Sequence, residues 1–153
     1  MAKEIQRFTD EAISQYNLLS DEEVATLKIK VGKSHRSEKD WDVIKKLITD
    51  KAVITMNSMD RKLYRKTSIE NVFTDKGFLI VFSNINDCAN YIRWFNQQMM
   101  RNGYFEIGAI PFGDVLDISD RKKIPVAIDI DPTTRGHFIY YEKGRMTDAI
   151  LAR

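Results

Sequence analysis

The chain of 153 residues is poor in several residue types, and each scarcity narrows the class of protein. Cys88 is its one cysteine, so no internal disulfide can form, and a reducing cytoplasm is the expected location. One cysteine and two histidines also argue against the usual thiolate zinc sites, and we predict no cofactor. No apolar run approaches the roughly 20 residues that cross a bilayer, so we expect no membrane partner.

The N-terminal residues carry acidic side chains and lack the apolar segment of a secretory signal, so we expect no such signal. Apolar residues make up 43% of the chain and charged residues 30%, which is typical of folded globular proteins rather than disordered ones. The length suits one domain with its own core. We therefore predict a single domain over residues 1–153.

Basic residues are unevenly distributed along the chain. The formal net charge is +2, yet residues 28–66 hold 12 of the 24 Lys+Arg and 5 of the 22 Asp+Glu. Such a basic segment can bind nucleic acid or another anion. Because only Trp41 and Tyr64 could stack on bases there, a solvated charged surface is the favoured interpretation.

The first 35 residues are predicted to form a helical extension. Apolar residues at helical spacing indicate a first helix, namely Ile5, Phe8, Ala12, Ile13 and Tyr16. Ser20 and Glu23 form a capping-box pattern before a second helix. Leu27, Ile29 and Val31 also alternate as a strand would, so both interpretations stay open at the end of this segment.

After the extension, helical and strand patterns alternate. Strands are predicted over residues 52–56, 62–69, 78–82, 104–110, 124–130 and 137–141. Helices are predicted after the capping residues Ser37 and Ser83 or Asn84, after Pro111, and at the C-terminal end from Thr147. These patterns predict an α+β fold, in which a mixed sheet of about five strands carries packed helices and follows the helical N-terminal extension.

Short motifs over residues 50–146 resemble those of the SseB family N-terminal domain, also called the enhanced serine sensitivity domain. The motifs are Phe82-Ser83 before a helix, Pro111-Phe112 at the start of a short helix, and Asp131-Pro132 after an apolar strand. The resemblance implies a compact α+β domain with no established catalytic centre. It transfers no catalytic residues to this chain.

The segment after the apolar strand at 124–130 is the main candidate for chemistry. Asp129 and Asp131 alternate with isoleucines, so strand periodicity predicts both carboxylates on one face, where they could bind Mg²⁺. Arg135 could then contact a phosphate group, and His137 could act as a base. The alternative is a strand end, with Pro132 opening a connecting loop, and this structural interpretation is favoured.

Other candidate residues have simpler structural explanations. Cys88 lies on the apolar stripe of its predicted helix, which indicates a core thiol rather than a nucleophile. The Gly32-Lys33-Ser34 segment lacks the upstream glycine of a phosphate-binding loop. Trp94 and Met100 lie away from the centre of the same stripe and could form an exposed surface for a partner.

Three functions follow from these patterns, in decreasing order of support. The first is a non-catalytic interaction or regulatory domain, which binds a protein partner or self-associates through the N-terminal helices or the surface at Trp94 and Met100. The second is a metal-dependent phosphoesterase-like enzyme that uses Asp129 and Asp131. The third is a nucleic-acid or anion binder that uses residues 28–66.

Overall fold

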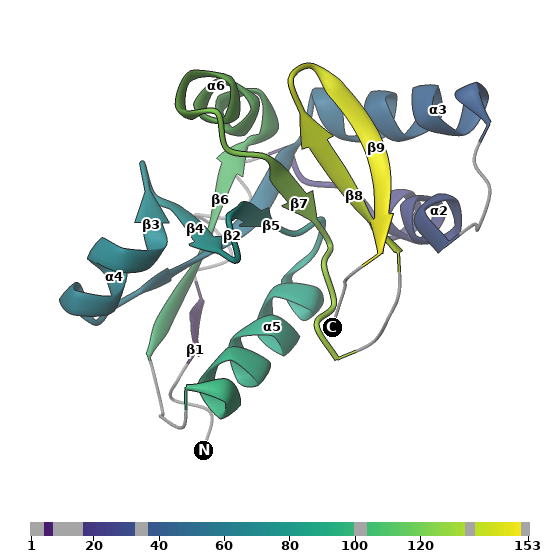
Figure 1. Ribbon diagram of the computed structural model, residues 1–153. Helices are drawn as coiled ribbons and strands as arrows, with labels where there is room; N and C mark the ends of the chain where they lie inside the picture. Colours follow the sequence, from purple (N-terminus) through teal and green to yellow (C-terminus); the bar gives the residue numbers. More distant parts are fainter. Residues whose placement is uncertain (1–4, 8–16, 33–36, 100–103, 134–136, 151–153) are drawn as a thin grey trace.

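The computed structural model describes residues 5–7, 17–32, 37–99, 104–133 and 137–150 (Figure 1). The helices are α2 (Asp21–Gly32), α3 (Glu38–Thr49), α4 (Arg61–Thr67), α5 (Ile85–Gln98) and α6 (Phe112–Lys122). The strands are β1 (Ile5–Arg7), β2 (Ala52–Ser58), β3 (Ser68–Ile69), β4 (Val72–Asp75), β5 (Phe78–Val81), β6 (Phe105–Pro111), β7 (Val126–Ile128), β8 (His137–Glu142) and β9 (Arg145–Ile150). No helix of the described residues has the length and apolar character needed to cross a membrane.

The strands in the described residues form two sheets that join at one point. The three-stranded sheet has the order β1-β6-β2, and the six-stranded sheet has the order β3-β4-β5-β7-β8-β9. Parallel pairs, β1 with β6 and β5 with β7, occur beside antiparallel ones. Ile54 of β2 and Phe82 exchange two backbone hydrogen bonds, 2.7 and 2.8 Å long, and these link the sheets. The predicted α+β fold with a mixed sheet is confirmed, although the sheets hold more strands than expected.

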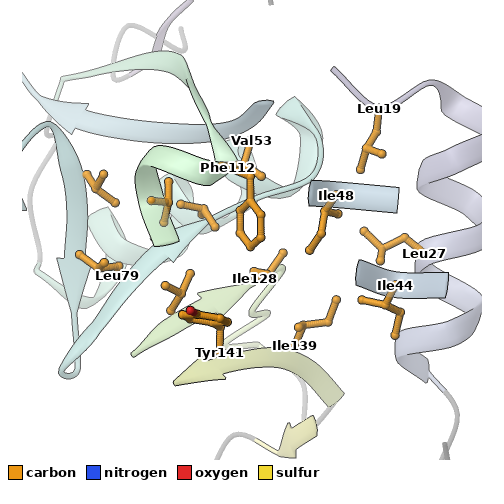
Figure 2. Close-up of a cluster of buried hydrophobic side chains, with 14 of the residues drawn as sticks. Leu19, Leu27, Ile44, Ile48, Val53, Leu79, Phe112, Ile128, Ile139 and Tyr141 are labelled. Carbon is orange, nitrogen blue, oxygen red and sulfur yellow. The ribbon is translucent and has the colours of Figure 1, made fainter. Parts of the chain in front are cut away.

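Each face of the six-stranded sheet has its own apolar core, because successive side chains of β5 point to opposite faces. Leu79 and Val81 belong to the cluster that α2, α3 and α6 cover, whereas Ile80 belongs to the cluster that α5 covers. Figure 2 shows the first cluster, in which Leu27 of α2 lies near Ile139 of the sheet. Helix α2, part of the expected N-terminal extension, therefore contributes directly to the core.

The second core is built around an aromatic cluster. The ring of Phe73 in β4 meets the rings of Tyr91 and Phe95 in α5 and of Phe105 in β6, at centroid distances of 6.2, 5.3 and 6.3 Å. The interplanar angles are between 75° and 88°, so the rings pack edge to face, which is a favoured geometry for aromatic pairs. Phe73 thereby connects α5 to both sheets.

Local signals account for the helix starts. The Ser37 side chain accepts a hydrogen bond from the backbone N–H of Asp40, and the Asp40 carboxylate accepts one from Ser37, so α3 begins with a complete capping box. Asn84 caps α5 by accepting from the N–H of Asp87 at 2.9 Å. The predicted caps at Ser37 and Asn84 are therefore confirmed.

The predicted strand over residues 62–69 is wrong, because most of it is the helix α4. Asp60 starts this helix: its Oδ1 accepts hydrogen bonds from the N–H groups of Lys62 and Leu63, at 2.9 and 3.4 Å. Leu63 is the buried residue of α4. One apolar position does not define a helical period, so the hydrophobic pattern could not reveal this helix.

Two further expectations are wrong at the ends of the chain. Ile5 does not begin a helix, because Ile5–Arg7 is β1 and pairs with β6; the rest of that expected helix, residues 8–16, lies outside the described residues. Thr147 lies in β9 rather than in a helix. Lys143 and Gly144 have positive φ angles of 52° and 82°, which turn the chain tightly so that β9 pairs with β8.

The aromatic cluster predicts a large stability effect at Phe73. Phe73→Ala should lower the free energy of unfolding by about 3–5 kcal/mol, because it removes a buried ring and leaves a cavity. Urea denaturation followed by circular dichroism measures this loss. The half-exposed Met99→Ala is the control and should change the free energy by less than about 0.5 kcal/mol. Equal effects of the two changes would contradict the described core.

Candidate functional site

Asp129 follows β7 and turns its side chain into the protein. Its backbone is left-handed, with a φ of 61°, a conformation in which Asp is enriched. The N–H of Asp129 donates to the carbonyl oxygen of Val81 at 3.0 Å, and its Oδ1 accepts a hydrogen bond of 2.7 Å from the N–H of Ser83. Asp129 is 7% exposed. It therefore ties the end of β7 to the segment that follows β5.

Lys28 of α2 lies between two carboxylates. Its Nζ donates a hydrogen bond to Oδ2 of Asp87 in α5 and lies 3.8 Å from Oδ2 of Asp129. The same Asp87 oxygen accepts from Nδ2 of Asn84 at 3.0 Å, which holds it in place. One cation thus links α2, α5 and the end of β7.

Burial decides the ionisation of Asp129. Loss of water around the carboxyl group raises its pKa, and the nearby charge of Lys28 and the hydrogen bond from Ser83 oppose this without reversing it. No group in the described residues donates a hydrogen bond to Oδ2 of Asp129.

Asp131 lies apart from this arrangement. It is exposed, and its Oδ1 accepts hydrogen bonds from the backbone N–H and the hydroxyl group of Thr133, at 2.9 and 2.6 Å. The expectation that Asp129 and Asp131 share one face of a strand is therefore wrong, because β7 ends at Ile128 and Asp129 leaves the strand in a left-handed conformation. In the part of the chain that the structure describes, no group of three His, Cys, Asp or Glu is placed to hold a metal ion.

Arg135 and His137 are the other two residues predicted to contact a ligand in this segment. Arg135 lies outside the described residues. His137 begins β8, but its side chain is not among those described. The structure therefore brings Asp129 together with Lys28 and Ser83, which the sequence did not indicate. The capping pattern from Asn84 to Asp87 was visible in the sequence, but it gave no reason to expect Lys28 beside it.

A hollow of about 230 Å³ adjoins this cluster, between the beginning of α2 and the beginning of α5. Its polar lining includes Asp21, Ser83 and Asn84. The hydroxyl oxygen of Ser83 accepts a hydrogen bond of 3.1 Å from Nδ2 of Asn84. These two lining side chains are thus bonded to each other where α5 begins.

Helix α5 places the other two candidates differently. Cys88 is buried, and burial raises the pKa of its thiol, so the expected core thiol is confirmed. Trp94 is half-buried: its ring lies 5.4 Å from the ring of Tyr91, and Nζ of Lys76 lies 4.5 Å from the indole centroid. Met100 lies outside the described residues. Tyr91 and Lys76 therefore cover part of Trp94, the one of these two residues that the structure describes.

The sequence did not indicate a different apolar surface, formed by Met59 and Tyr104. These two side chains are 51% and 40% exposed. They lie beside each other, because the N–H of Met59 donates a hydrogen bond of 2.9 Å to the carbonyl oxygen of Tyr104. We call this pair the Met59–Tyr104 patch. The two positions are 45 residues apart in sequence, so only the pairing of β2 with β6 could reveal the patch.

Helix α4 follows Met59 after its capping residue, Asp60, and is strongly basic. Four side chains of its two turns are cationic and exposed: Arg61, Lys62, Arg65 and Lys66. None of the four forms an ion pair with a residue that the structure describes. Helix α4 therefore presents four exposed cations and no acid of its own, and it begins two residues after Met59.

Comparison with family models, with curated proteins and with solved structures finds no match for this chain.

The raised pKa of Asp129 predicts a measurable pH dependence. The folded state retains the Asp129 proton at pH values where the unfolded chain has released it, so this group stabilises the fold less as pH rises above its ordinary value of 3.8. Asp129→Asn keeps an acceptor for Ser83 and tolerates the left-handed backbone, but it cannot titrate. The difference in unfolding free energy, wild type minus variant, should therefore decrease as pH rises from 3.8 toward neutrality.

Urea denaturation at a series of pH values measures this difference. Asp131→Asn is the matched control, because it makes the same change at an exposed side chain outside the buried cluster. A difference that grows with pH for Asp129→Asn would mean that the attraction to Lys28 outweighs burial, and the described balance would be wrong.

Proposed function

We propose that this chain is a non-catalytic interaction domain that binds a partner protein through the Met59–Tyr104 patch and the adjoining cations of α4. The supporting observation is the combination of two exposed apolar side chains with the exposed cations of the helix that follows Met59 and Asp60. Protein interfaces commonly have this composition, with an apolar centre inside a polar rim, and Tyr, Met and Arg are enriched in them.

The charge of the surface favours a different protein over a second copy of this chain. A two-fold contact would place the same residues of both copies against each other. The cations of both α4 helices would then lie within one interface, and like charges within an interface cost free energy. We therefore propose a heterologous partner.

The resemblance to the SseB family N-terminal domain is also retained as a proposal. The order of elements supports it: β5 leads through Phe82-Ser83 into α5, β6 leads through Pro111 into α6, and β7 precedes Asp131-Pro132. A domain of that family carries no established catalytic centre, which agrees with an interaction role for this chain.

Site-specific photo-crosslinking tests the interaction surface. A photoreactive phenylalanine analogue at Met59 or Tyr104, in the full chain expressed in its cells of origin, should yield a discrete cross-linked protein that mass spectrometry identifies. The same analogue at the exposed Lys45 of α3 is the control, because α3 lies on another side of the molecule (Figure 1). Cross-links that are equally frequent from Lys45, or that join only copies of this chain, would refute the proposed surface.

A further inference from the structure

The cations of α4 are arranged at a cost to the helix itself. Arg61 and Arg65, and likewise Lys62 and Lys66, are four residues apart, so like charges are neighbours on the helix surface. Such pairs destabilise a helix, and an acidic residue in place of one of them would remove the repulsion. In α6, by contrast, a cation has acidic partners: Arg121 pairs with Asp117 at 3.0 Å and with Glu70 at 2.7 Å.

A hollow of about 370 Å³ opens beside the end of α4. Lys66 and Lys76 both line it, and Ile69 and Ile124 are apolar parts of its lining. Ile69 and Ile124 are half-buried and pack against the first core, so the hollow has a firm apolar part. Lys76 and Gly77 have positive φ angles of 56° and 83°, which define the tight turn that carries Lys76.

Two acidic residues lie near the hollow, and each has a hydrogen-bond or ion-pair partner. Asp75 is the acid in its lining, and Oδ2 of Asp75 accepts a hydrogen bond of 2.5 Å from the hydroxyl group of Tyr91. Glu70, in the turn before β4, pairs with Arg121. Lys66 and Lys76 therefore outnumber the one acid of the lining, Asp75, and Arg65 precedes Lys66 on α4.

We propose that the hollow binds a short acidic segment of the partner protein, with an apolar side chain against Ile69 and Ile124 and carboxylates on Arg65, Lys66 and Lys76. This inference rests on the proposed function and names the chemistry of the partner. Charge complementarity supports it, because an anionic segment would relieve the repulsion within α4 on binding. The ligand must also have an apolar side chain to contact Ile69 and Ile124, and a simple polyanion has none.

Nucleic acid fits this surface less well than an acidic peptide. Helix α4 has 7 residues, so its cations extend over only about 10 Å. Tyr64 is half-buried and its hydroxyl group donates to Asn71, so its ring is not a free stacking platform.

Selection from a displayed library of random peptides on the immobilised full chain tests the inference. Enriched peptides should contain several Asp or Glu residues around an apolar residue, and their binding should weaken as salt rises. Replacing both Arg65 and Lys66 by Glu should weaken binding of a selected peptide by about tenfold or more, because two attractive charge pairs become repulsive. The same replacement of Lys45 and Lys46 in α3 is the matched control and should change binding less than about twofold.

The charge-reversed variant could lose binding because α4 unfolds. A second variant, with Gln in place of both Arg65 and Lys66, removes the charges without reversing them. Circular dichroism checks the fold, and the Gln variant should show an intermediate loss of affinity. Enriched peptides without acidic residues, or binding that does not depend on the α4 charges, would overturn this inference. If such peptides still cross-link at Met59, the proposed function would stand; if neither selection nor cross-linking finds a partner, both would fall.

A homopolymeric RNA in the same binding assay tests whether the cations of α4 bind nucleic acid instead. RNA should bind more weakly than the selected acidic peptides at the same salt concentration. Tighter binding of RNA, lost in the variant with Glu at positions 65 and 66, would overturn the inference in favour of a nucleic-acid ligand.

Discussion

The parallel pairing of β5 with β7 is the constraint on which the rest of the structure depends. Leu79, Ile80 and Val81 pair in register with Val126, Ala127 and Ile128, and all six side chains are buried. Two neighbouring parallel strands cannot be joined by a tight turn, so the chain between them must cross over. That crossover contains α5, β6 and α6, and it places α5 on one face of the sheet and α6 on the other.

The same pairing brings the two strand ends together and creates the buried polar cluster there. Ser83 and Asp129 lie next to each other because each follows the end of its strand, and the carboxylate then accepts from the backbone of Ser83. Lys28 compensates part of the buried charge from α2. The arrangement has carboxylates and a cation, as a catalytic site would, but its bonds join α2, α5 and β7 to one another.

The sequence allows good predictions where the signal is local. The apolar run of β5 and the single stripe of α5 gave the correct elements, and the side chains of Ser37 and Asn84 gave the correct caps. The sequence could not reveal the contact between Ser83 and Asp129, which are 46 residues apart, because only the strand pairing sets it. The prediction that Asp131 shares a strand face with Asp129 was wrong, because it required the strand to continue past Ile128, where β7 ends.

Helix α4 shows how tertiary contacts can hold charge in a fixed place. A helix of 7 residues is not stable alone in water, because nucleation is costly and few hydrogen bonds repay it. Asp60 satisfies its first N–H groups, and burial of Leu63 among Phe73 and the second core anchors its inner face. The four cations on its outer face are therefore held by the core rather than by helix propensity. A partner that binds them meets charges already in position, so little conformational entropy of the backbone is lost on binding.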